Sequence, residues 1–187
     1  MEKVLEMLER AVAEAAREGL VDAWYWRQPS PLGHLTVVTS ETGVCAVAFP
    51  EHGDEVLEEV AAALGPRVCP ARGETAEVRR QLDEYFLGKR QAFDLVTDLR
   101  LTTDFRRLVL RRLALVPYGA TTTYAGLAAA VGRPKGPRAV GQAVGHNPVP
   151  IIVPCHRVLA SDGTLGGYGG GLERKRLLLE LERRGKR

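Results

Sequence analysis

The stretch from Thr121 to Asn147 constrains the fold most, because it reads as two helices joined by a tight turn. "TTTYAGLAAAVG" is an Ala-rich helix that Gly132 closes, "RPKG" is the turn, and Pro137 in "PRAVGQAVGHN" suits the first position of the second helix. Arg138 lies near the exposed start of that helix, where helix-turn-helix proteins contact DNA. A plain αα-hairpin with small residues for close helix packing is an equally open interpretation of this segment alone.

The second predicted helix is slim. Between Arg138 and the end of the helix, most side chains are those of Ala or Gly. A helix without bulky side chains can bring its backbone close to a groove of DNA. The residues expected to face the DNA are therefore Arg138, Ala139, Gly141 and Gln142.

The charge of the chain is unevenly distributed. Residues 99–187 hold 16 Lys and Arg against 5 Asp and Glu, a net charge of +11, whereas residues 1–98 hold 10 against 18, a net charge of −8, which leaves +3 for the whole chain. The basic half favours a polyanion as its partner, although a solvated basic face has the same composition.

The string "IIVPCHRVLA" places a thiol directly after an apolar run. An isolated intracellular cysteine is commonly a buried small hydrophobe, and we interpret Cys45 and Cys69 in that way. Cys155 differs because His156 can take the thiol proton, directly or through water, and because Asn147, the only asparagine of the chain, lies just upstream. Cys, His and Asn also suggest a papain-like hydrolase, but those enzymes keep Cys and His far apart in the sequence.

A nucleophile and base of this kind need a third group that orients the histidine. The last predicted helix, "LERKRLLLELERR", offers Glu182, which follows Leu178 and Leu179 by four and three residues and so lies beside a leucine row. A half-buried carboxylate in that place needs a partner. The alternative is a surface glutamate that pairs with Arg183 or Lys186 in solvent.

Three longer stretches carry a resemblance to a known family. "PYGATTTYAGLAAAVG", "RAVGQAVGHNPVPIIVPCHRV" and "GYGGGLERKRLLLELE" resemble the O6-alkylguanine-DNA alkyltransferases, which move an alkyl group from damaged guanine to their own cysteine. The resemblance runs without an evident gap from Phe105 to Glu182, and it is looser through "SPLGHLTVVTSETGVCAVAF" and "QLDEYFLGKRQAF". It implies single-turnover, direct-reversal repair of double-stranded DNA, which is bound from the minor groove with the alkylguanine flipped out of the stack.

The resemblance also implies roles for individual residues. Cys155 accepts the alkyl group, His156 is its base through a water molecule, and Glu182 fixes the tautomer of His156. Tyr124 donates to guanine N3 as the base leaves, and it helps the DNA backbone to rotate. Arg138 fills the gap that the extruded nucleotide leaves in the duplex.

Further groups follow from the same resemblance. Asn147 braces the turn between the recognition helix and a buried strand, "IIVP", that delivers the thiol to the floor of a pocket. The groups that read the guanine edge are the backbone of Val153, Cys155 and Val158 and the loop around Tyr168 and Gly169. Gly169 offers only its backbone N–H, because it has no side-chain hydroxyl.

The length of 187 residues suits one large domain or two small ones. We expect an acidic α/β domain at residues 1–98, whose first 20 residues are a helical extension, and a mostly helical, winged-helix-like domain at residues 99–187. The first domain should contain a small antiparallel sheet with a hairpin at "SETG", where Gly43 permits a positive φ. A helix is expected near residues 2–18, others in "DEVLEEVAAALG" and before Gly88, and a strand-like segment after Gly88.

Compartment and cofactors follow from what the sequence lacks. No window approaches eighteen consecutive apolar residues, the start is a charged amphipathic helix, and three cysteines give no disulfide framework. We expect a cytoplasmic, nucleoid-associated monomer that contacts no membrane. Cys45, Cys69, His34 and His52 have no ligand-like spacing, so we expect no metal, and the chemistry requires no cofactor.

Two other function classes use part of this pattern. A helix-turn-helix regulator would use the basic half but gives no reason for Cys155 and His156 beside the motif. A cysteine hydrolase would use the thiol but not the DNA-binding half. One benzyl group on Cys155 after incubation with O6-benzylguanine would distinguish the alkyltransferase from both.

Overall fold

The computed structural model describes residues 7, 10–12, 14–15 and 18–185. The chain forms two compact units, one of residues 1–83 and 94–101 and one of residues 84–93 and 102–187. The described residues among 7–15 are helical, as expected of the first predicted helix. The rest of that helix lies outside the described residues, apart from Glu18, which lies in a turn.

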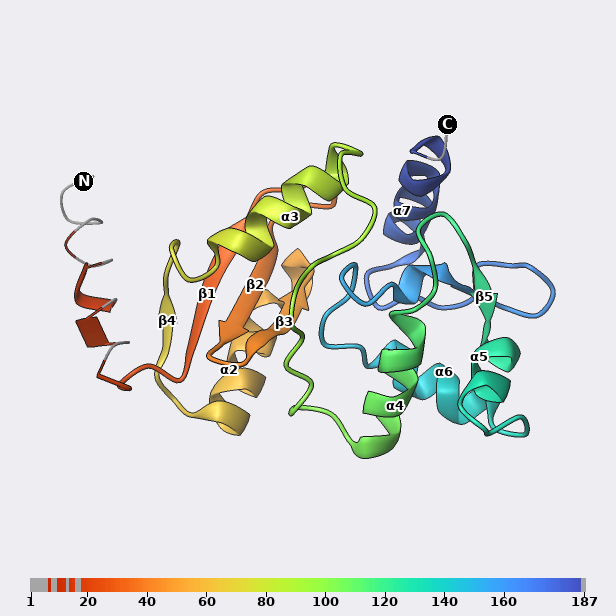
Figure 1. The fold of residues 1–187 in the computed structure, drawn as a ribbon, viewed down its shortest axis with the longest axis horizontal. Helices are drawn as coiled ribbons and strands as arrows, with labels where there is room; N and C mark the ends of the chain where they lie inside the picture. Colours follow the sequence, from red (N-terminus) through yellow and green to blue (C-terminus); the bar gives the residue numbers. More distant parts are fainter. Residues whose placement is uncertain (1–6, 8–9, 13, 16–17, 186–187) are drawn as a thin grey trace. The chain divides into compact units, whose positions relative to one another are not determined.

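A four-stranded sheet forms the centre of the first unit, in the order β3-β2-β1-β4 (Figure 1). The strands β1 (Ala23–Gln28), β2 (Leu35–Ser40) and β3 (Gly43–Ala48) are antiparallel neighbours. The three-residue strand β4 (Val68–Pro70) joins β1 in parallel. The predicted antiparallel sheet is thus present, with one short parallel strand added at its edge.

The β2–β3 hairpin lies where the sequence predicts it. Gly43 has φ +149°, and a Cβ at this position would collide with the backbone carbonyl of Val96, so the turn requires glycine. The strand-like segment expected after Gly88 is not a strand, and forms only an isolated bridge between Thr97 and Val44. In this bridge the N–H of Val44 donates to the carbonyl of Val96, and the carbonyl of Val44 accepts from the N–H of Asp98.

Two helices accompany the sheet. The helix α2 (Gly53–Leu64) contributes Val60 to a core that contains Ala23, Val38 and Cys45. The helix α3 (Ala76–Phe86) buries Val78 and Leu82. A short 3-10 turn, η1 (Pro50–His52), precedes α2. All six residues of β2 are buried, so both faces of the sheet are covered at its centre.

The second unit is mostly helical. The helices α4 (Asp104–Leu113), α5 (Tyr124–Ala130) and α6 (Pro137–Gly145) pack against one another, and α5 and α6 form the predicted helix-turn-helix (Figure 1). Gly132, with φ +72°, ends the first of these two helices. The helix α7 (Leu172–Arg184) follows a glycine-rich loop. None of the described helices is long and apolar enough to span a membrane.

The apolar run before Cys155 differs from the buried strand that was expected there. Ile151, Ile152 and Val153 are buried as expected, but they form a turn and not a strand. The backbone N–H of Val153 bonds the carbonyl of Val149 at 2.9 Å, and Ile151 has φ +75°. Prolines at 148, 150 and 154 explain the difference, because each removes a backbone donor that a strand would need.

Candidate active site

A two-stranded parallel ladder connects the helix-turn-helix to the cysteine segment. The strand β5 (Thr122–Thr123) pairs with β6 (Val158–Leu159), and Thr122 lies opposite Val158. Tyr124 begins α5 directly after β5, while the 3-10 turn η2 (Cys155–Arg157) ends directly before β6. The ladder therefore places the phenol of Tyr124 and the thiol of Cys155 on neighbouring segments.

Asn147 braces the turn that leads to the thiol. Its Nδ2 donates to the carbonyl of Val153 at 2.8 Å, and its Oδ1 accepts from the N–H of Val149 at 3.1 Å. The one side chain thereby closes residues 147–153 into a fixed loop. A buried turn needs such a partner, because its backbone groups have no sheet to bond.

The thiol of Cys155 is buried, with 7% of the residue exposed. Burial raises the pKa of Cys155, against hydrogen bonds from the side chains of Asn147 and Tyr168 and the positive charge of Lys175, which act in the opposite direction. The resting group is therefore a thiol, and a thiolate forms only when a base removes the proton.

His156 has the geometry of such a base. Its Nε2 lies 2.9 Å from Oε1 of Glu182, and both side chains are fully buried. A carboxylate can only accept, so the proton lies on Nε2, and Nδ1 is left as the acceptor in the neutral ring. Among the described residues Nδ1 has no hydrogen-bond partner. Burial lowers the pKa of His156 more than Glu182 raises it, which favours the neutral ring.

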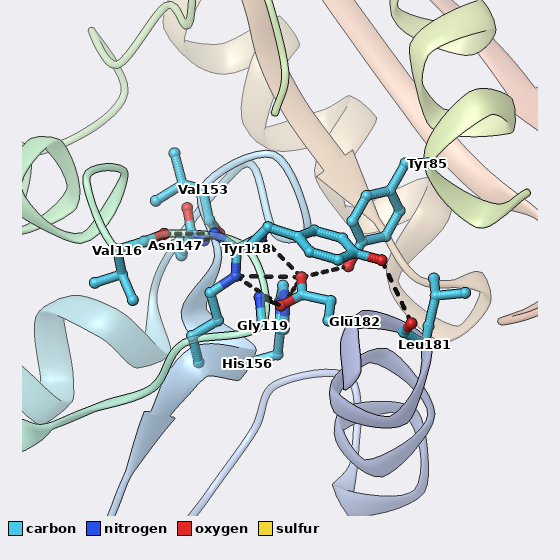
Figure 2. Close-up of polar contacts among 10 residues, drawn as sticks. Tyr85, Val116, Tyr118, Gly119, Asn147, Val153, His156, Leu181 and Glu182 are labelled. Atoms are coloured by element: carbon cyan, nitrogen blue, oxygen red, sulfur yellow. Dashed lines mark hydrogen bonds and ion pairs between the residues drawn. The ribbon is translucent and has the colours of Figure 1, made fainter. Parts of the chain in front are cut away.

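Glu182 is the centre of a buried polar cluster, drawn in Figure 2. Besides His156, its oxygens accept from Arg157, with the guanidinium at 2.8–3.2 Å, from the hydroxyl of Tyr85 at 2.7 Å and from the N–H of Gly119 at 2.8 Å (Figure 2). Burial alone would raise the pKa of Glu182, but the hydrogen bonds from His156 and Arg157 outweigh it and lower the pKa to about 2. The carboxylate is ionised at every physiological pH.

Arg157 and Tyr85 have no role in the site that the sequence predicts. Arg157 directly follows His156, so its place in the cysteine motif was a signal that could have been used. Tyr85 is 97 residues from Glu182, and no local pattern marks it.

Lys175 is a third buried group that sequence reasoning missed. The side chain, fully buried on α7, donates through Nζ to the carbonyls of Val158 at 2.7 Å, Gly167 at 3.3 Å and Leu165. These three bonds tie the glycine-rich loop to β6. The loop carries Tyr168, whose hydroxyl acts to lower the pKa of the Cys155 thiol, and Gly169, which is exposed.

Tyr124 lies between two glycines. A Cβ at Gly141 of α6 would lie 3.8 Å from the ring, and a Cβ at Gly166 of the loop would lie 3.5 Å from its hydroxyl oxygen. Burial and the nearby Cys155 raise the pKa of Tyr124, so the phenol keeps its proton. The ring thus has little room on either side and presents a neutral donor.

The predicted DNA-facing residues lie together on one side of α6. Arg138, Ala139 and Gln142 are exposed and Gly141 is half-buried, whereas Val140, Ala143 and Val144 are buried. The helix therefore presents one small, uncharged strip with the guanidinium of Arg138 at its N-terminal end.

Several of the backbone groups expected to read guanine already form hydrogen bonds within the protein. The carbonyl of Val153 already accepts from Asn147 and from the N–H of Cys155, and the carbonyl of Val158 accepts from Lys175. The N–H of Val158 bonds the carbonyl of Cys155. The described residues contain no group of three or more His, Cys, Asp and Glu side chains that could hold a metal ion.

Comparison with known families matches most of the chain. Residues 104–184 match the DNA-binding domain of 6-O-methylguanine DNA methyltransferase, and residues 24–99 match its ribonuclease-like domain. The methylated-DNA--protein-cysteine methyltransferase of Mycobacterium tuberculosis H37Rv is 53% identical over 154 residues, which are 82% of this chain and 88% of that protein. The constitutive Bacillus subtilis protein of the same name is 37% identical over 86% of this chain and 95% of its own.

Solved structures give the same result. The M. tuberculosis O6-methylguanine methyltransferase has a TM-score of 0.76 and 40% identity, over 87% of this chain and 93% of that one. M. tuberculosis OGT in complex with DNA has a TM-score of 0.75 and 38% identity over the same shares. These proteins share the arrangement of a sheet-containing N-terminal part and a helical C-terminal part.

Proposed function

Because the chain belongs to the 6-O-methylguanine DNA methyltransferase family, we propose that Cys155 is the residue that accepts the alkyl group in its reaction. The protein repairs O6-alkylguanine in DNA by direct reversal, transferring the alkyl group to a cysteine of its own. Cys155 is supported as that cysteine by the basic nitrogen available on the adjacent His156. The thiol of Cys45, by contrast, donates to the carbonyl of Val38, and burial raises its pKa to about 12.

The transfer is a displacement at the alkyl carbon. Nδ1 of His156 takes the thiol proton, directly or through a water molecule, and the imidazolium that forms is stabilised by the carboxylate of Glu182. The Cys155 sulfur then attacks the alkyl carbon, a C–S bond forms and the bond to O6 breaks. The departing guanine anion takes a proton at N3 from Tyr124. The thioether has no step that would regenerate the thiol, so one molecule repairs one lesion.

Access to the alkyl carbon requires base flipping. The thiol is buried in the protein, so a base stacked in a duplex cannot reach it, and the nucleotide must turn out of the helix at a cost of a few kcal/mol. We assign Arg138 to the gap in the duplex, because it is exposed at the start of α6. The slim face of α6 would then lie in the minor groove. The second lone pair of the Val158 carbonyl would meet the guanine edge, because the carbonyl and the N–H of Val153 are already bonded within the protein.

The proposed function also implies an oligomeric state, a compartment and a cofactor requirement. The protein acts on DNA as a monomer in the cytoplasm, at the nucleoid. The reaction needs no metal or organic cofactor, because the leaving group is a guanine that a neutral phenol can protonate.

One experiment tests the assignment of Cys155. Wild-type protein incubated with O6-benzylguanine should gain a single benzyl mass, located on Cys155 by peptide mapping. Cys155→Ser should gain none and should keep its affinity for undamaged duplex, because that affinity rests on phosphate contacts. The matched control Cys69→Ser, which changes a partly buried thiol elsewhere, should react like wild type. A benzyl group on Cys45 or Cys69, or a folded Cys155→Ser protein that still reacts, would refute the assignment.

A further inference from the structure

A single oxygen of Glu182 is shared by three donors. Oε1 accepts from Nε2 of His156 at 2.9 Å, from Arg157 at 2.8 Å and from the hydroxyl of Tyr85 at 2.7 Å (Figure 2). The bond from Tyr85 is the shortest of the three. The negative charge of this oxygen is therefore shared between His156 and two other donors.

Tyr85 is held in the orientation that makes this bond. The residue is fully buried on the last turn of α3. Its ring centroid lies 5.2 Å from that of Phe93 and 6.0 Å from that of Tyr118. Burial, with the negative charge of Glu182, raises the pKa of Tyr85 well above its ordinary range, so the hydroxyl always carries the proton that it donates.

The charges of the cluster determine the state of His156. Arg157 supplies one positive charge to the one negative charge of Glu182, so the pair is already neutral. A carboxylate whose only partner was His156 would stabilise the imidazolium strongly, and the ring would lose its free lone pair. Each further donor on Oε1 draws electron density from that oxygen. The hydrogen bond that Oε1 accepts from Nε2–H of His156 becomes weaker, and the uncharged ring is favoured.

We propose that Tyr85 is a positioning residue for the repair reaction: with Arg157 it takes up the charge of Glu182, so that His156 stays uncharged and its Nδ1 can accept the proton of the thiol. This inference rests on the proposed function, because it assigns His156 as the base of Cys155. The step itself moves one proton from the sulfur to Nδ1. Tyr85 exchanges no proton and touches neither DNA nor the alkyl group.

The other charged and titratable groups around the ring are the same in the variants proposed below. On η2 these are Arg157 and the thiol of Cys155, and on α7 they are Lys175 and Glu182 itself. Tyr118, from the segment after α4, also feels the charge of Glu182. A change in titration after substitution of Tyr85 therefore reports on its hydroxyl.

Tyr85→Phe tests the proposal, because it removes the hydroxyl and keeps the ring. The measurement is the single-turnover rate with free O6-benzylguanine from about pH 5 to 9. Without the donor, Oε1 stabilises the imidazolium more, so the acid-side midpoint should move upward by about one pH unit. The rate at the wild-type midpoint should fall about fivefold, while the rates near pH 9 should agree within about twofold.

Tyr118→Phe is the matched control. It removes a phenolic hydroxyl from the same aromatic cluster, but that hydroxyl donates to the carbonyl of Leu181 at 3.4 Å and not to Glu182. Its midpoint should equal that of wild type. An unchanged or lowered midpoint in Tyr85→Phe, an equal shift in Tyr118→Phe, or a lower rate at every pH without a shift would overturn the proposal.

A second measurement does not depend on turnover. The ring ¹⁵N shifts of His156 should show a neutral Nε2–H tautomer in wild type at pH 7 and a higher titration midpoint in Tyr85→Phe. If wild type is alkylated on Cys155 and neither midpoint moves, the role of Tyr85 is refuted while the proposed function stands. If wild type forms no adduct on Cys155, both fail together.

Discussion

Arg138 and Tyr124 allow DNA distortion to be separated from chemistry at the level of single residues. Arg138 is exposed at the start of α6, while the Tyr124 ring is held between Gly141 and Gly166 beside the thiol segment. Arg138→Ala should slow repair of a duplex lesion and leave the reaction with free O6-benzylguanine near wild type, because a free base has no unstacking cost. Tyr124→Phe removes the proton donor and should slow both substrates.

Single-turnover rates on both substrates, at one stated salt concentration, measure this difference. Lys135→Ala is a control for charge alone, since Lys135 is exposed in the turn before α6. It should weaken duplex binding slightly without changing the rate at saturation. Equal impairment of the free base and the duplex by Arg138→Ala would mean that Arg138 supports the pocket and does not enter the duplex.

Local sequence patterns mark four of the residues that we propose for the site. Cys155 and His156 are adjacent, Asn147 lies in the turn before them, and Glu182 stands beside a leucine row. Tyr85 and Lys175 carry no such mark, because packing decides their partners. Tyr85 bonds a residue 97 positions away, and Lys175 bonds carbonyls outside its own helix. Lys175 lies in an arginine-rich helix, a pattern typical of solvent-exposed lysines. Only the structure shows that its amine is buried.

At the level of elements, α5 depends on its N-cap. The helix has seven residues, and the side chain of Thr123 accepts from the N–H of Gly126 at 3.0 Å. Thr123→Ala should lower the free energy of unfolding by about 1 kcal/mol, the usual cost of losing such a cap. Because Tyr124 is the first residue of α5, the rate with free O6-benzylguanine should fall as well. Thr123→Ser should restore both.

Thr103→Ala provides the comparison. Thr103 caps α4 in the same way, through the N–H of Arg106 at 3.3 Å, but α4 carries none of the proposed catalytic side chains. A similar loss of stability in urea, with a wild-type rate, is expected. If both variants lose rate equally, the cap of α5 acts on stability only and does not position Tyr124.

The elements also show where sequence patterns fail. Helices α5, α6 and α7 are predicted by the Ala-rich run, Gly132, Pro137 and the leucine row, all of which act within a few residues. The family resemblance implies a strand in the apolar run before Cys155, yet the prolines and the side chain of Asn147 make this segment a turn. The short strand β4 has too few residues for a period to be seen.

At the level of the whole molecule, Glu182 links folding to pH. Its pKa is lowered from 4.5 to about 2, so the folded state binds fewer protons than the unfolded state between these values. The stabilisation is present above pH 4.5 and is lost as the pH falls toward 2, by up to about 3 kcal/mol. Urea unfolding at pH 7, 4 and 3 should therefore show a falling midpoint.

Glu182→Gln should remove that part of the pH dependence. The variant should be less stable at pH 7, because Arg157 loses its counter-charge, but its stability should change less between pH 4.5 and 3. Glu180→Gln, on the exposed side of the same helix, should keep the wild-type profile. Identical slopes for wild type and Glu182→Gln would show that other carboxylates cause the acid unfolding.

The buried cluster of Glu182, Arg157, His156 and Tyr85 has an evolutionary consequence. Burying charged groups costs desolvation energy, and apolar residues of similar volume often serve a core equally well or better. The cluster therefore persists only while selection requires a working base next to the thiol. In a lineage released from that requirement, these four positions should drift toward leucine, methionine and phenylalanine while the fold survives. A descendant of this chain could then bind DNA and still have lost the means to repair it.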